Sequence, residues 1–358
     1  MKRRMLLKSL AAFAGMSTAG GALARSDAQS VEDLRPIWEA WKDAFLRADG
    51  RVVDTLQQEA SHSEGQGYGM VLASFFEDES AFERMFEWTE RHLAIRSDAL
   101  LAWRWLPAEA NPVPDRNNAS DGDLFYAWAL ARAGAKFGQR SYLRRAQDIV
   151  DALAETCIMP MPGAGGRLLF LPAEHGFTHD DRITINPSYY MPLAMRELAA
   201  ATGVSKLAAC AQAGEALLDE LAADGLVPDW VDISEDGMRP AADLPSNAGY
   251  EAMRVPLFLI WSRLHTHRAV RQIARVYERQ VEPGRSAPTV IEPLSGLVLE
   301  TSADPGYQAL AGLSVCANRN DHGAALPPFT ASQPYYPATL QLFAMIAVLE
   351  ASPECVPL

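Results

Sequence analysis

Glu64 stands at the head of a glycine-rich segment, residues 62–70, which reads His-Ser-Glu-Gly-Gln-Gly-Tyr-Gly-Met. Alternate glycines allow a backbone to turn tightly and to come close to a ligand. The pattern is not that of a dinucleotide-binding loop, because no strong strand precedes it and an acidic residue begins it. Glu64 is therefore a candidate catalytic acid; the alternative is an acid that only stabilises a helix N-terminus.

A second acidic segment, residues 117–123, reads Asn-Asn-Ala-Ser-Asp-Gly-Asp and runs into an apolar helical pattern. Its carboxylates are Asp121 and Asp123, and Ser120 or Asp121 alone would also be suitable helix caps. Two acids around a glycine are compatible with a calcium loop as well. An EF-hand is disfavoured, because apolar residues occupy its later ligand positions and its closing glutamate is absent. We therefore take both aspartates as candidate site residues.

Aromatic residues accompany these acids in segments expected to be loops or helix starts, namely Trp103, Trp105, Tyr189 and Tyr335. An aromatic face in such a place matches the C–H face of a sugar ring. Glycoside hydrolysis requires one protonated carboxylic acid and a second carboxylate that acts on water or on the sugar. The combination of acids and aromatics therefore indicates a glycoside hydrolase.

Three motifs make this indication specific, and a fourth is weaker. They are Ser-Glu-Gly-Gln-Gly-Tyr-Gly-Met at 63–70, Ala-Ser-Asp-Gly-Asp at 119–123, Asn-Pro-Ser-Tyr at 186–189 and the weaker Tyr-Glu-Ala-Met-Arg-Val-Pro at 250–256. With these motifs the chain resembles glycoside hydrolase family 8, and within it the periplasmic endoglucanases of bacterial cellulose-synthesis systems. The resemblance implies an all-α, (α/α)6 barrel with a cleft for a β-1,4-glucan (cellulose or cellooligosaccharides), and an inverting mechanism without a metal or other cofactor.

The resemblance also assigns roles to the acids. Glu64 matches the family's general acid, which protonates the glycosidic oxygen. Asp121 matches the signature aspartate, which we expect to bind the sugar at the cleaved bond and to stabilise positive charge in the transition state. Glu251 occupies the position of the water-activating base, where the cellulase branch generally has aspartate. We expect Glu251 to act as the base; Asp243 or Asp123 is an alternative.

The remaining site expectations concern substrate binding. Arg254 follows Glu251 by about one helical turn and either pairs with a carboxylate in the cleft or faces solvent. The residues expected to bind substrate are Trp103, Trp105, Asp123, Tyr189, Arg254 and Tyr335.

Two other functions remain open because of the glutamate at position 251. One is a glucan-binding protein of the cellulose-synthase export machinery with little activity. The other is a hydrolase of another β-1,4 polysaccharide such as chitosan, whose cationic chains would suit an acidic surface. The net charge of −13, from 32 basic and 45 acidic residues, argues against a nucleic-acid partner.

Helical periodicity dominates the body of the chain, and pairs of helices recur at roughly fifty residues, as expected of antiparallel hairpins around a centre. The predicted helices are 31–47, 82–92 with Ser80 as its cap, 121–137, 141–153, 191–201, 206–222, 248–261, 268–281, 305–315 and 331–349. The best strand signals are 167–171 and 289–291.

The first 24 residues have the pattern of a secretory signal. Lys2, Arg3 and Arg4 form a basic start, residues 9–21 are small and apolar, and Ala-Leu-Ala at 22–24 is suitable for cleavage. The paired arginines resemble the twin-arginine export motif. We expect a single catalytic domain at 25–358, periplasmic or secreted, without a membrane span after signal removal; an uncleaved N-terminal anchor is the alternative.

The four cysteines are widely spaced and form no Cys-x-x-Cys pair, which favours thiols over a metal site. A disulfide is possible in an oxidising compartment, but its pairing is open. His265 and His267 lack a nearby third ligand, so we expect an interhelical loop there rather than a metal site.

Overall fold

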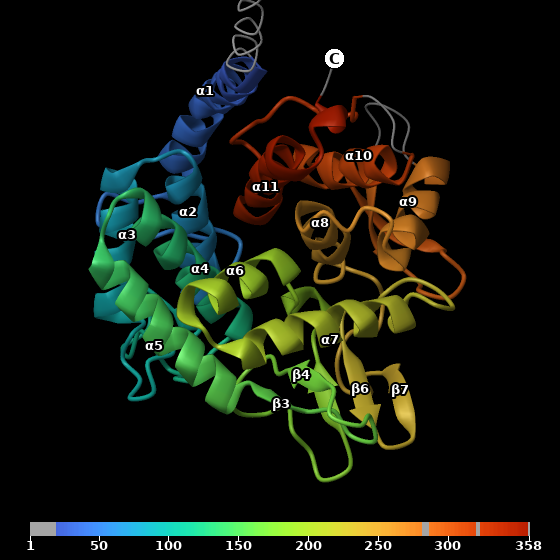
Figure 1. Cartoon of the computed structure of the whole chain (residues 1–358). Coiled ribbons are helices and arrows are strands. Elements are labelled where there is room, and N and C mark those ends of the chain that lie inside the picture. The colour runs from blue at the N-terminus through green and yellow to red at the C-terminus, as the bar shows by residue number, and fades with distance from the viewer. Residues whose placement is uncertain (1–18, 281–285, 320–322, 357–358) are drawn as a thin grey trace, which may run out of the picture.

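The computed structural model describes residues 19–280, 286–319 and 323–356 (Figure 1). Its α-helices are α1 (Ala19–Phe45), α2 (Ser63–Phe75), α3 (Glu79–His92), α4 (Ser120–Lys136), α5 (Arg140–Thr156), α6 (Pro192–Thr202), α7 (Ser205–Leu221), α8 (Arg254–Trp261), α9 (Arg268–Gln280), α10 (Pro305–Arg319) and α11 (Tyr335–Ala351). Short 3-10 helices lie at Pro187–Tyr189 and Pro353–Cys355.

The helices pair as hairpins around a closed ring of buried helices. Helix α2 packs against α4, α4 against α6, α6 against α8, α8 against α11, and α11 returns to α2. Helices α3, α5, α7 and α9 each pack on the ring helix that precedes them in the chain. Ring helices such as α4 and α11 are apolar on nearly all sides, whereas α3 and α5 have one polar face. The predicted all-α barrel is confirmed.

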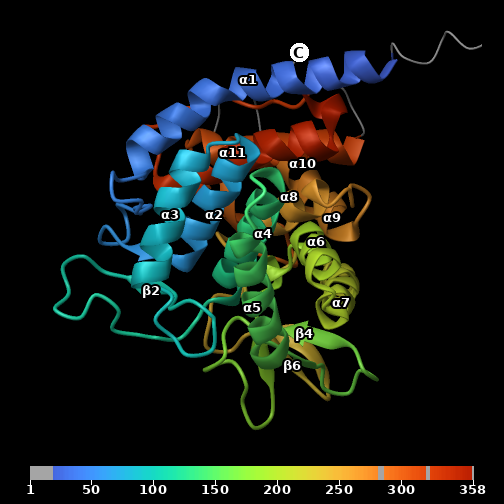
Figure 2. The same ribbon diagram turned by 60° about the vertical axis from the view of Figure 1, so that its left-hand side comes forward.

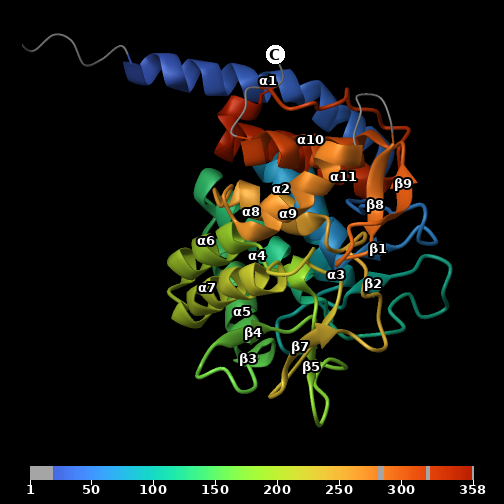
Figure 3. The ribbon, with the colours of Figure 1, turned by 90° about the vertical axis from the view of Figure 1, so that its right-hand side faces the viewer.

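Short antiparallel strands decorate the ends of the helices. They are β1 (Ser61–His62) with β2 (Arg104–Trp105), β3 (Ile158–Pro160) with β4 (Leu168–Phe170), β5 (Ile183–Ile185) with β6 (Val231–Ser234) and β7 (Gly237–Pro240), and β8 (Ala287–Ile291) with β9 (Val298–Ser302). Figure 3 shows the pairs β1–β2 and β8–β9 near the same edge of the view. Both predicted strands are confirmed, as β4 and β8.

Most predicted helices are confirmed within a few residues, with four corrections. Helix α1 begins at Ala19 and not at residue 31. The glycine-rich segment 62–70, which we expected to turn tightly as a loop, is helical from Ser63 and forms the first part of helix α2. Helix α8 begins at Arg254 and not at Ala248, because residues 249–253 form a separate turn. The cap of α3 is Asp78, whose side chain accepts a hydrogen bond from the Ala81 N–H, and not Ser80.

Close packing against α4 explains why a glycine-rich segment is helical. A Cβ atom on Gly67 would lie 2.9 Å from the backbone nitrogen of Tyr126, and one on Gly122 would lie 2.1 Å from Ser63 Oγ. Helices α2 and α4 therefore cross where both lack a side chain. Tertiary packing here outweighs the cost of about 1 kcal/mol for a glycine in a helix interior.

The predicted signal falls mostly outside the described residues. Its described part, from Ala19, belongs to α1, whose first turns project beyond the rest of the fold (Figure 2). Within the described ranges, none of the helices is both long enough and apolar enough to cross a bilayer.

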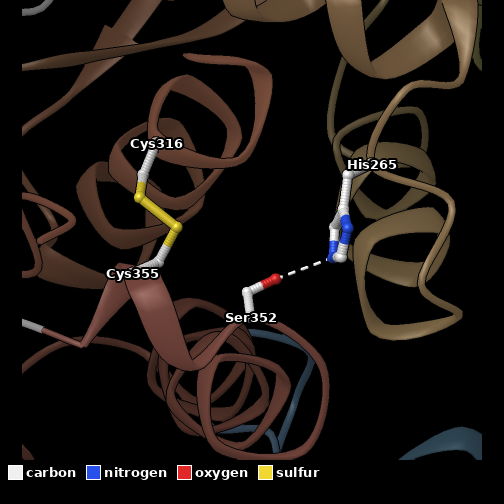
Figure 4. Close-up of a disulfide and its surroundings, with 4 residues drawn as sticks. All are labelled: His265, Cys316, Ser352 and Cys355. Carbon is white, nitrogen blue, oxygen red and sulfur yellow. Dashed lines mark hydrogen bonds between the residues drawn. A yellow bond between two sulfur atoms is a disulfide. The ribbon is translucent and has the colours of Figure 1, made fainter. Parts of the chain in front are cut away.

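One disulfide is present, between Cys316 at the end of α10 and Cys355 near the C-terminus (Figure 4). Cys157 and Cys210 are buried free thiols.

His265 Nε2 lies 2.8 Å from Ser352 Oγ, and His267 Nε2 lies 3.0 Å from the carbonyl oxygen of Glu215. The two histidines therefore contact different partners, and both partners lie outside the loop that carries the histidines. The part of the chain that the structure describes holds no group of three or more His, Cys, Asp or Glu residues arranged for a metal ion.

Candidate active site

A cavity of about 430 Å³ brings the predicted acids together from distant parts of the chain. Glu64, Asp121, Glu251 and Arg254 all line it. Three of the predicted aromatic residues line it as well, namely Trp103, Tyr189 and Tyr335.

Arg254, the first residue of α8, is the hub of this cavity and is only 1% exposed. Its Nη1 donates to Glu64 Oε2 and, at 3.3 Å, to Asp121 Oδ2. Its Nη2 donates to Glu251 Oε2. One cation thus bridges all three predicted acids, so Arg254 pairs with carboxylates and does not face solvent.

Two neutral hydroxyl groups also lie within hydrogen-bond distance of this guanidinium, whereas its buried Nε has no partner among the described residues. Tyr68 OH lies 3.1 Å from Nη1, and Ser188 Oγ lies 2.7 Å from Nη2. The planar fork of arginine suits such simultaneous contacts, which a lysine ammonium could not make in the same geometry.

Glu64 is placed by the start of helix α2. It lies in the first helical turn, where the positive end of the helix dipole favours a carboxylate. The neighbouring Ser63 N–H donates to the carbonyl oxygen of Trp103 at 2.9 Å, which ties the helix start to the loop that carries Trp103. The side chain of Glu64 is 21% exposed, so it remains open to the cavity.

Asp121 is the second residue of α4 and is almost fully buried. Its Oδ1 accepts the Gly122 N–H at 2.8 Å. Burial raises the pKa of Asp121 well above its usual value; the charge of Glu64 raises it further, and Arg254 opposes both. Burial and the charge of Glu64 thus disfavour the charged form of Asp121, whereas Arg254 favours it.

Glu251 belongs to the turn before α8. Its Oε2 accepts a hydrogen bond from Asn186 Nδ2 at 2.9 Å, in addition to that from Arg254. Asn186 also organises its own segment, because its Oδ1 accepts the N–H and the hydroxyl of Ser188. The Asn-Pro-Ser-Tyr motif thus supports Glu251 directly.

Aromatic side chains border the acids. The ring of Tyr189 lies 5.6 Å from the guanidinium carbon of Arg254. Trp103 is half-buried, and its indole N–H donates to Asp115 at 2.8 Å. Tyr250 also lines the cavity and is 42% exposed, while Tyr336 OH donates to the carbonyl oxygen of Tyr250 at 2.6 Å.

Two residues predicted to bind substrate lie away from the cavity lining. Trp105 packs edge-on against Trp88 and carries Arg51 over its ring at 5.0 Å. Asp123 is fully buried and accepts hydrogen bonds from the Leu101 N–H and from Asn118 Nδ2. Asp123 has no exposed surface, which corrects our expectation that it contacts substrate directly. Trp105 is only partly buried, and its contact with substrate stays a prediction.

Asp123 instead anchors the loop that brings Trp103 to the cavity. Burial raises the pKa of Asp123 to about 7.

The alternative base Asp243 has a side chain that is 83% exposed and pairs with Arg182. Of the three carboxylates that we considered for the base, Glu251 alone lines the cavity.

Sequence reasoning missed several residues that contribute to this site. Tyr68, Asn186 and Ser188 lie within the quoted motifs, but nothing in their spacing indicates that they face Arg254 or Glu251. Tyr250 and Tyr336 were visible as tyrosines beside predicted site residues, and this proximity was the available signal.

Comparisons with known proteins show which family this sequence and fold resemble. The sequence model described as glycosyl hydrolases family 8 matches residues 10–349. A protein of Novacetimonas hansenii described as a probable endoglucanase is 31% identical over 344 residues, which cover 94% of this chain and 98% of that protein. An endoglucanase of Cellulomonas uda is 34% identical over 232 residues, and the match covers only 64% of each chain.

Among solved structures, the endo-β-1,4-glucanase CMCax of Acetobacter xylinum is similar with a TM-score of 0.77 and 31% identity. The match covers 87% of this chain and 97% of that chain. Both the sequence and the fold are therefore matched over most of the described residues.

Proposed function

Because this chain belongs to glycosyl hydrolase family 8, we propose that it is an endo-β-1,4-glucanase that cleaves cellulose-type glucan with inversion at the anomeric carbon. The observation that carries this proposal is the single cavity in which Arg254 bridges Glu64, Asp121 and Glu251. The endo-β-1,4-glucanase activity named for the similar Acetobacter xylinum structure supports the substrate class.

The proposed reaction is a single displacement. Glu64 gives its proton to the glycosidic oxygen as the bond to the anomeric carbon breaks. Glu251 takes a proton from a water molecule that attacks the opposite face of the sugar. Inverting enzymes hold these two carboxyl groups about 6.5–9.5 Å apart to leave room for that water.

Asp121 and Arg254 support this displacement without reacting. A buried carboxyl group beside the cleaved bond is suited to bind sugar hydroxyls and to stabilise positive charge that develops on the ring. Arg254 holds Glu64 and Glu251 through different nitrogen atoms, so one rigid group sets the positions of acid and base. The role assigned to each residue stays a prediction.

Release of reducing ends from carboxymethylcellulose tests the proposal. Glu64→Gln keeps the side-chain shape but cannot supply the proton, so we expect turnover to fall by about 10²–10⁴-fold. Binding of cellopentaose, measured by calorimetry, should persist in this variant. The matched control is Glu83→Gln, on the exposed side of α3, which should keep full activity.

Two outcomes would replace the proposal with another function. If the unchanged protein binds cellopentaose without releasing reducing ends, it is a glucan-binding protein. If it cleaves chitosan in preference to carboxymethylcellulose, its substrate is a different β-1,4 polysaccharide. Full activity in Glu64→Gln would remove Glu64 from the role of general acid.

We also propose that the protein is exported to the periplasm and acts beside cellulose-synthesis machinery. The sequence resemblance, the basic start with its paired arginines and the Cys316–Cys355 disulfide support this location, because disulfides persist in oxidising compartments. Replacing Arg3 and Arg4 together by lysine should retain the full-length protein in the cytoplasmic fraction. Unchanged export would exclude the twin-arginine route.

A further inference from the structure

A buried carboxylate outside the cavity holds the turn that carries Glu251. Asp229 lies shortly before β6 and is 6% exposed. Its Oδ1 accepts the N–H of Gly249 at 2.9 Å and the N–H of Ala252 at 2.8 Å. These two amides flank Glu251 on either side, so one oxygen atom fixes the backbone around the candidate base.

The same turn leads directly into Arg254. The Met253 N–H donates to the carbonyl oxygen of Gly249, and the Arg254 N–H donates to that of Glu251. Helix α8 has no side-chain hydrogen bond from its own N-cap residue, Met253. Asp229 thus satisfies amides at this helix start from a distant segment, as a capping side chain would.

The absence of a side chain at Gly249 leaves space for the Asp229 carboxylate. A Cβ atom at Gly249 would lie 2.6 Å from Asp229 Oδ2, closer than real Cβ contacts allow. The Asp229 N–H also donates to the carbonyl oxygen of Asn247 at 2.8 Å, which fixes the two segments against each other. A side chain at residue 249 would therefore push the Asp229 carboxylate out of its present position beside both amides.

We propose that Asp229 is a positioning residue for hydrolysis, which holds Glu251 and Arg254 in place through the backbone of residues 249–252, and that Gly249 is required for this contact. The proposal rests on the proposed function, in which Glu251 is the base. A displacement of about 1 Å at a reacting group can cost about a hundredfold in rate. Positioning should therefore appear in kcat more than in KM.

The buried environment of Asp229 agrees with this geometry. Burial raises the pKa of Asp229 to about 6, against the opposing effect of the two backbone N–H groups, while the charge of Glu251 adds to the increase. At pH 7 the group is mainly a carboxylate, which is the stronger acceptor for two amides.

The test compares Asp229→Ala with Asp229→Asn on cellopentaose. Loss of the acceptor in Asp229→Ala should lower kcat by about 10- to 100-fold, with KM changed by less than about threefold. The amide oxygen in Asp229→Asn can still accept both N–H groups, so kcat should recover to within about threefold of the unchanged protein. An unchanged kcat in Asp229→Ala, or an equal loss in both variants, would overturn the proposal.

Asp232→Ala is the matched control for a general loss of stability. Asp232 is another buried carboxylate, three residues further on, and accepts hydrogen bonds from Thr184 Oγ1 and the Ala242 N–H. Its removal should lower Tm and leave kcat close to that of the unchanged protein. If Asp232→Ala lowers kcat as much as Asp229→Ala, the effect is not specific to the turn and the proposal fails.

A second variant covers the case in which Asp229→Ala does not fold. Gly249→Ala keeps the carboxylate but forces it away from the turn, so it should also lower kcat by at least about tenfold. Wild-type kcat in Gly249→Ala would contradict the proposal.

Crystal structures of the variants test the positioning role independently of the proposed function. If the unchanged protein releases no reducing ends from any glucan, the proposed function fails, and crystal structures then decide the positioning claim. The turn at 249–253 should be displaced in Asp229→Ala and retained in Asp229→Asn. An unmoved turn in Asp229→Ala would refute the positioning role by itself.

Discussion

At the scale of single residues, the site depends on one guanidinium that serves three carboxylates. The motifs were sufficient to predict Glu64 and Asp121, because each acid lies beside a distinctive glycine pattern. They could not predict the hub role of Arg254, since its contacts join residues 190 and 133 positions apart. Such pairings follow from the closure of the barrel and not from local spacing.

Arg254→Lys tests this hub. A lysine ammonium cannot hold Glu64 and Glu251 in the planar, two-nitrogen geometry, so we expect kcat to fall by about a hundredfold or more. Arg145→Lys is the control, because Arg145 pairs with Glu90 outside the cavity. Reducing-end assays on both variants check the prediction, and near-normal activity of Arg254→Lys would contradict it.

Asp123 gives a prediction for stability. Burial raises its pKa to about 7 in the folded protein, whereas an unfolded aspartate titrates near 4. Between about pH 4 and 7 the folded state therefore holds a proton that the unfolded chain has released. The contribution of Asp123 to the free energy of unfolding must fall as pH rises through this window.

Urea unfolding at pH 5, 6, 7 and 8 measures this contribution as the difference between the unchanged protein and Asp123→Asn. The stability of the unchanged protein relative to the variant should decrease as pH rises. The exposed Asp243→Asn variant is the control and should show no such trend. A difference that increases with pH would refute the assignment.

At the scale of elements, the crossing of α2 and α4 determines where Glu64 lies. Sequence patterns predicted most helices, since their apolar periodicity is strong. They missed α2 because three glycines lower its helix propensity, and its stability comes from contact with α4. The short strands were mostly missed for a related reason, because two to five residues carry too little periodicity.

Gly122→Ala separates propensity from packing. Helix propensity alone favours alanine by about 1 kcal/mol, but the added Cβ would lie 2.1 Å from Ser63 Oγ and 2.7 Å from the backbone nitrogen of Glu64. Overpacking of this kind costs about 1–3 kcal/mol, so we expect a lower Tm and reduced activity. Gly65→Ala is the milder control, since its nearest neighbour is Tyr335 OH at 3.3 Å. A more stable Gly122→Ala variant would contradict the packing argument.

At the scale of the whole molecule, the ring of helices from α2 to α11 is closed. A disulfide joins the segment after α11 to the end of α10. The recurrence of helical hairpins and the family motifs were sufficient to predict the barrel. The Cys316–Cys355 pairing was not predictable, because it depends on where the C-terminal segment returns to α10. Sequence spacing contains no information about that return.

Removal of the disulfide should weaken the whole fold. The bond joins two cysteines that are 39 positions apart in the sequence. The double variant Cys316→Ser, Cys355→Ser should therefore have a free energy of unfolding that is lower by about 2–4 kcal/mol. Denaturant unfolding with and without reductant checks this result. Reductant should destabilise the unchanged protein and leave the double variant unaffected; an unchanged protein that is indifferent to reductant would contradict the prediction.

The central claim is a single displacement between Glu64 and Glu251, and the configuration of the first product tests it most directly. Proton NMR during the first minutes of cellopentaose hydrolysis distinguishes the anomer released by the enzyme from the one formed later by mutarotation. Inversion at a β-1,4 bond predicts that the α-anomer appears first. Initial release of the β-anomer would contradict the account.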